Sequence, residues 1–168
     1  MTSAVARSEP LSSAAFDGGA RAFLEGVLAR YAGHPRTLVV SLPAPVVPLP
    51  SAFAALEGAP AFLWEPPQGP GLVTVGATRS VAPSGADRGA QARAACEVVS
   101  GRMEAVYHPA VPPVRPRWLG GLAFAPGAAS EPPWSGFGDG RFVLPRWSYG
   151  RDGERAWLAL AVDGEGLD

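Results

Sequence analysis

The stretch Trp118-Leu119-Gly120-Gly121-Leu122-Ala123-Phe124 decides which fold the sequence predicts. Its apolar residues lie between turns rich in Gly, Pro and Ser, a pattern typical of a β-strand, here over residues 117–124. The paired glycines have no side chains, so another backbone or a large side chain can approach them closely, and the flanking aromatic residues fill the space beside them. We therefore expect these residues to serve packing and not catalysis.

Five further strands are predicted outward from this stretch, over residues 37–42, 61–65, 71–76, 141–147 and 155–162. The turn at 66–70 indicates that the second and third of these form an antiparallel pair. The last strand is apolar on both alternating sets of residues, so both of its faces should be covered.

Helices are predicted over residues 17–32, with Asp17 as N-cap, over 51–57, and over 84–107, where Ser84 and Asp87 resemble a capping box. Residues 1–16 are predicted to be a disordered leader and 17–168 a single domain. The fold class is therefore α+β, an antiparallel β-sheet with packed helices. Because the chain stops directly after a strand, we expect that domain to be incomplete.

Composition excludes several classes of protein. The 168 residues carry 14 basic side chains, all Arg, and 15 acidic ones, for a net charge of −1, which argues against a nucleic-acid-binding polycation. Hydrophobic residues make up 47%, enough for a buried core. No apolar run reaches the ~18 residues of a membrane span. The single Cys excludes an internal disulfide and fits a reduced, cytoplasmic setting.

The candidate reactive residues all have structural interpretations. Cys96 lies on the apolar stripe of its predicted helix, where a free Cys behaves as a small hydrophobe. His34 and His108 lack further ligands at metal-binding spacing. The segment 136–140 precedes a strand and lacks the spacing of a phosphate loop, so we interpret it as a tight turn. Carboxylates are not paired on one element, and most of the five Trp are expected in the core. We therefore assign no catalytic, cofactor or metal residue.

Three groups of motifs, in the same order and spacing over residues 36–162, resemble the N-terminal half of the isochorismate synthases of menaquinone and siderophore biosynthesis, which are chorismate-utilising enzymes. They are an aromatic-Trp strand with the glycine-ended strand after it, the Gly-Gly-x-Ala-Phe strand, and a Trp-x-x-Phe turn with a Phe-x-Leu-Pro strand. The residues that carry the resemblance are Trp64, Gly76, Trp118, Gly120, Gly121, Phe124, Trp134, Phe137, Phe142, Leu144 and Pro145.

The resemblance implies a Mg²⁺-dependent reaction in which water adds at C2 of chorismate as the C4 hydroxyl leaves. It implies a lysine base, a glutamic acid that protonates the leaving group, and two glutamates that hold the metal, all C-terminal to the matched segment. This chain contains no Lys. We therefore expect it to be inactive alone, with chorismate and the missing C-terminal half as partners. The alternatives are a salicylate or anthranilate synthase component, or a non-catalytic binding module that uses exposed strand edges.

Overall fold

The computed structural model describes residues 13–33 and 36–163, which fold into three helices and nine strands. The helices are α1 (Ser13–Tyr31), α2 (Leu49–Ala54) and α3 (Arg88–Ser100). The strands are β1 (Thr37–Pro43), β2 (Ala61–Trp64), β3 (Gly71–Val75), β4 (Arg79–Val81), β5 (Glu104–Tyr107), β6 (Leu119–Leu122), β7 (Gly140–Leu144), β8 (Trp147–Asp152) and β9 (Arg155–Asp163). Strands and helices are mixed along the chain, which confirms the α+β class.

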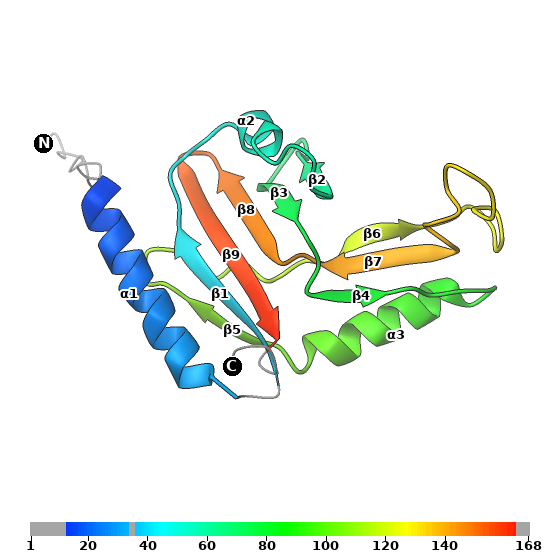
Figure 1. Ribbon diagram of the computed structural model, residues 1–168, viewed down its shortest axis with the longest axis horizontal. Helices are drawn as coiled ribbons and strands as arrows, with labels where there is room; N and C mark the ends of the chain where they lie inside the picture. Colours follow the sequence, from blue (N-terminus) through cyan, green and yellow to red (C-terminus); the bar gives the residue numbers. More distant parts are fainter. Residues whose placement is uncertain (1–12, 34–35, 164–168) are drawn as a thin grey trace, which may run out of the picture.

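Six strands form the large sheet, in the order β2-β3-β8-β9-β1-β5. Strand β1 is apolar on both faces, and Val40 at its centre is 0% exposed. Helix α1 packs along this sheet, where Val27 joins Leu38, Val40 and Leu42 in one buried cluster (Figure 1). The apolar residues of α1 recur at helical spacing and therefore lie on one face of the helix, and this face packs on β1, the most completely buried strand.

The small sheet has the order β4-β7-β6 and extends from the large sheet (Figure 1). The chain passes between the sheets several times, and the two shortest connections run from β3 to β4 and from β7 to β8. They are tied by backbone hydrogen bonds from the Thr78 N–H to the Leu144 carbonyl at 2.9 Å and from the Ala161 N–H to the Arg146 carbonyl at 2.8 Å. Leu144 packs against Val39 and Ala161 of the large sheet, so the two sheets share a core at this junction.

The local predictions that rest on alternation and turn residues are confirmed. The pair β2 and β3 is antiparallel, with Phe62 opposite Thr74. Buried residues occur on both alternating sets of β9, with Trp157 and Ala161 on one and Leu160 on the other. No helix among the described residues is long and apolar enough to cross a membrane.

The prediction of one long helix over 84–107 is wrong at its C-terminal end. Helix α3 ends at Ser100, and the next residues turn and form β5, which pairs in parallel with β1 at Leu38↔Glu104 and Ser41↔Tyr107. The backbone groups on the free edge of β1 gain partners in this way, and Val106 packs against the cluster under α1. The prediction of a purely antiparallel sheet is corrected by the same pair.

The prediction of one strand over 141–147 is also wrong. Pro145 has no N–H to donate, so β7 ends at Leu144, and a separate strand, β8, runs from Trp147 to Asp152. Strand β4 was not predicted, because three residues with two exposed side chains carry no alternation signal.

Helix boundaries differ by a few residues from the sequence analysis. Helix α1 begins at Ser13, within the predicted leader, so Asp17 is not its N-cap; the Ala residues at 14 and 15 favour helix strongly. Residues 1–12 of that leader lie outside the described residues. Helix α2 begins at Leu49, two residues early, with a Pro in its first turn. At α3, Asp87 makes no side-chain cap, and the Gln91 amide instead bonds both the N–H and the carbonyl of Ser84.

Candidate functional site

The paired glycines of β6 allow a close approach between backbones, as predicted. A Cβ at Gly120, whose φ is +156°, would lie 2.7 Å from the Cα of Phe142 and would overlap the Arg141 carbonyl oxygen on β7. A Cβ at Gly121 would meet only the ring of Phe137, at 3.8 Å. The two glycines therefore differ: the first is required by strand β7, and the second leaves room for an aromatic ring.

The other signature residues at the junction of the sheets are packing residues as well. Leu144 and Pro145 are buried beside a cavity of about 30 Å³ that Trp157 also lines. Trp118 donates its indole N–H to the Ser100 hydroxyl at 3.1 Å and so links β6 to the end of α3. Gly76, at φ +68°, turns the chain between the two sheets.

A group of signature aromatics at the far end of the small sheet does not pack in this way. Phe124 is fully exposed and Trp134 is 65% exposed. With Leu122 and Phe137 they surround a hollow of about 230 Å³ whose walls are otherwise alanines. We call these four residues the distal patch. For Phe124 and Trp134, the prediction that they fill space beside the glycines is wrong within this chain.

The prediction that the five Trp lie mostly in the core is wrong too. Trp157 is fully buried in the large sheet, whereas Trp64, at the β2 edge, is 49% exposed beside Phe62 at 41%. Trp118 and Trp147 are half-buried. The exposed aromatic residues named here therefore lie at the distal patch and along β2.

The loops beneath the distal patch are held by Asp139 and Arg88. The Asp139 carboxylate accepts the Gly127 N–H at 2.6 Å and the Gly85 N–H at 2.7 Å, and these two bonds lower its pKa. Arg88 donates to the carbonyls of Gly85, Ala123 and Phe124 at 3.1 to 3.2 Å. Segment 136–140 is thus a turn that leads into β7, as predicted, and its carboxylate ties the loops at Gly85 and Gly127 together.

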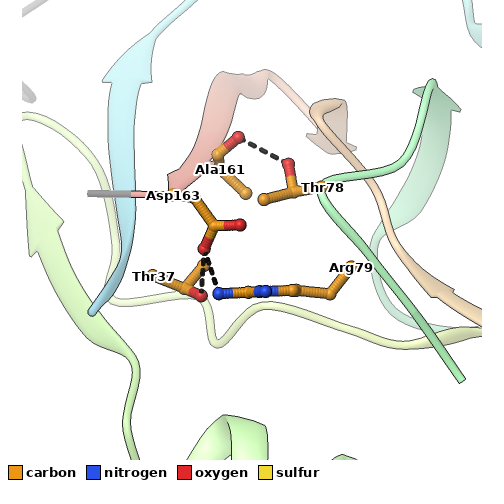
Figure 2. A network of polar contacts seen from close by, with 5 residues as sticks. All are labelled: Thr37, Thr78, Arg79, Ala161 and Asp163. Atoms are coloured by element: carbon orange, nitrogen blue, oxygen red, sulfur yellow. Dashed lines mark hydrogen bonds and ion pairs between the residues drawn. The ribbon is translucent and has the colours of Figure 1, made fainter. Parts of the chain in front are cut away.

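A second polar network ties the end of β9 to β1 and β4. Figure 2 shows Asp163 between the Thr37 hydroxyl, which donates to its Oδ1 at 3.1 Å, and the Arg79 guanidinium, 2.6 Å from the same oxygen. Close by, the Thr78 hydroxyl donates to the carbonyl of Ala161 at 2.7 Å. Sequence reasoning missed both networks, because their members are far apart along the chain.

The residues considered for reactive chemistry stay apart. Partial burial raises the pKa of the Cys96 thiol, which disfavours the nucleophilic thiolate. His108 accepts the Ala110 N–H through Nδ1 and meets the Phe23 ring edge-on at 5.0 Å, while His34 lies outside the described residues. In the described part of the chain, no three His, Cys, Asp or Glu side chains are placed to hold a metal ion.

Comparison with known proteins relates the chain to a family and to a solved structure. The model of a family described as "chorismate binding enzyme" matches residues 23–165. The fold is similar to that of MenF, the menaquinone-specific isochorismate synthase from Escherichia coli, with 23% sequence identity and a TM-score of 0.51. That similarity covers 84% of this chain and 28% of the MenF chain, so the present chain spans less than a third of that enzyme. No curated protein sequence matches significantly.

Proposed function

The chain belongs to the chorismate-binding enzyme family, and on this premise we propose that it is the N-terminal portion of an isochorismate synthase of the cytoplasm. In this proposal the 168 residues build one wall of the enzyme, and the reacting groups lie in a portion outside them. The observation that carries the proposal is the family match over residues 23–165, a stretch that corresponds to only part of a solved synthase.

The chemistry of the described residues supports a structural role in the reaction. Conversion of chorismate to isochorismate needs a base for the water that adds at C2 and an acid for the hydroxyl that leaves C4. The chain has no Lys to act as that base, and its described acidic side chains do not converge on a metal site. The Asp139 carboxylate already accepts hydrogen bonds from two backbone N–H groups and interacts electrostatically with the nearby Arg88. We therefore assign scaffold roles, and no catalytic role, to the signature residues.

The test is an assay of the purified 168-residue chain with chorismate and Mg²⁺, with products separated by chromatography. MenF from Escherichia coli serves as the positive control. We expect no isochorismate, salicylate or anthranilate above the level of a blank without protein. Formation of isochorismate by the chain alone would refute the assignment of the reacting groups to another portion. Formation of salicylate or anthranilate would move the chain to a different branch of the family.

One observation favours a second function, a non-catalytic binding module. The distal patch exposes Phe124 and Trp134 without covering them, and exposed aromatic clusters mark interaction sites. Co-expression separates the two functions: a polypeptide carrying the catalytic part of a synthase should bind this chain and become active if the scaffold proposal is right. If the chain binds such a polypeptide without any gain in activity, the module is favoured.

A further inference from the structure

Three arginines from separate segments meet at one pocket on the opposite end of α3 from the distal patch. Arg36 precedes β1, Arg79 begins β4, and Arg102 follows the last turn of α3. Together with the Thr37 and Ser80 hydroxyls and the side chain of Val98, they line a pocket of about 380 Å³. We call it the cationic pocket. Its size lies within the range of sites for small molecules.

Among the described residues, the positive charges around the cationic pocket outnumber the negative ones. The Arg79 guanidinium forms an ion pair with Asp163, whose Oδ1 lies 2.6 Å from Nη2 of Arg79. Arg36 is only loosely paired, because its Nη1 lies 3.8 Å from Oε2 of Glu104. The Arg102 backbone N–H donates to the Val99 carbonyl at 3.0 Å, but its guanidinium has no hydrogen-bond or ion-pair partner within residues 13–33 and 36–163. Three guanidinium groups therefore face two carboxylates, and the excess positive charge lies on the side of Arg36 and Arg102.

A structural role explains part of this arrangement. A cation just beyond a helix C-terminus stabilises the helix dipole, and Arg102 is two residues past Ser100. The dipole needs only one such charge, however, and it does not explain why Arg36 is brought from another segment to the same pocket. Like charges placed together repel unless an anion lies between them, and this points to a ligand.

We propose that the cationic pocket binds a small organic carboxylate, held by Arg102 and Arg36, with its apolar part against Val98. The planar guanidinium matches a carboxylate with two parallel hydrogen bonds. Val98 is 57% exposed, so an apolar ring or chain can lie on it and lose contact with water. This surface favours an organic acid over inorganic phosphate. The proposal does not depend on the proposed function, because the pocket lies wholly within described residues of this chain.

Benzoate is a suitable probe, and titration into the ¹⁵N-labelled 168-residue chain can be followed by NMR. Shifts should be confined to residues around the cationic pocket. The affinity of Arg102→Gln should fall about fivefold, as expected when one exposed charge contact is lost. The matched control is Arg93→Gln, an exposed arginine of the same helix, which should bind benzoate as the unchanged chain does. Arg36→Gln provides a second, independent loss.

Two further titrations, with benzamide and with inorganic phosphate, distinguish an organic carboxylate from other kinds of ligand. Benzamide has the same ring without the charge and should not bind, and inorganic phosphate should bind more weakly than benzoate. Equal binding of benzamide and benzoate would overturn the charge recognition, and equal or tighter binding of phosphate would overturn the choice of an organic acid. If benzoate shifts no residue of the pocket, or if Arg102→Gln and Arg36→Gln bind it unchanged, the site itself is refuted. Amide dispersion in each spectrum shows that each variant is folded.

Discussion

Gly120→Ala tests whether strand β7 requires the absence of a side chain in β6. The added methyl group would lie 2.7 Å from the Cα of Phe142 and 2.8 Å from the carbonyl carbon of Arg141. These are backbone atoms of a strand that is paired on both sides, with β4 and with β6, so they cannot move away singly. Overpacking of this kind costs about 1 to 3 kcal/mol, and each ladder hydrogen bond that opens adds about 1 kcal/mol.

We therefore expect Gly120→Ala to lower the free energy of unfolding by about 3 kcal/mol. With an m-value of about 2 kcal/mol per M of urea, the unfolding midpoint should fall by about 1.5 M. The matched variant is Gly121→Ala, whose methyl group would meet only the Phe137 ring at an ordinary 3.8 Å. It should stay within about 1 kcal/mol of the unchanged chain, since less backbone freedom in the unfolded chain favours Ala.

Urea unfolding followed by Trp fluorescence gives the two midpoints, and hydrogen exchange of the amides in β6 and β7 shows where the destabilisation lies. Exchange should accelerate in the small sheet of Gly120→Ala first. If the two alanine variants have the same midpoint, the close approach of β6 and β7 does not exist, and the packing role of the paired glycines is wrong.

Three other variants test further features of the structure. Backbone hydrogen bonds hold the pKa of Asp139 below its ordinary 3.8, so the ionised carboxylate stabilises the fold above that pH, and this contribution is lost as the pH falls through the folded pKa. Asp139→Asn should therefore weaken the dependence of the urea midpoint on acid pH, and an unchanged dependence would contradict this role. The double variant Phe124→Ser/Trp134→Ser should keep its free energy of unfolding within about 0.5 kcal/mol, since both side chains are exposed, and should bind less of a hydrophobic dye; dye binding at the original level would place the dye-binding surface elsewhere. Gly150→Ala puts a methyl group into the buried indole of Trp157, 2.6 Å from its Nε1, and should cost about 2 kcal/mol and alter the Trp emission; unchanged emission and midpoint would count against this contact.

The elements that sequence reasoning predicted correctly are those whose signal is local. Strand β1 is mainly apolar, and β2 and β3 are two mainly apolar runs around a Pro-rich turn, so neighbouring residues alone identify them. The Gly-Gly strand β6 is of the same kind, and its requirement for close backbone contact follows from residue type.

The elements that were missed depend on partners distant in sequence. Residues 104–107 continue the helical stripe of α3 and were predicted as helix, yet they form β5 because β1 offers an unpaired edge. Tertiary pairing overrides local preference in such a case. The network of Thr37, Arg79 and Asp163 has the same cause, since its members are separated by up to 126 residues.

The signature aromatics show a different limit of sequence reasoning. Phe124 and Phe23 are the same residue type, but Phe23 of α1 packs against the buried cluster that α1 forms with β1, whereas Phe124 is fully exposed. Burial depends on what is brought to a side chain, and residue type alone does not reveal it. The signature residues therefore divide physically: Gly120, Leu144 and Pro145 stabilise this chain itself, whereas Phe124 and Trp134 add exposed apolar area without stabilising it. That division supports the proposal of a scaffold that another portion of the enzyme covers, and the co-expression experiment probes it directly, because Phe124→Ser/Trp134→Ser should then abolish association while leaving the fold intact.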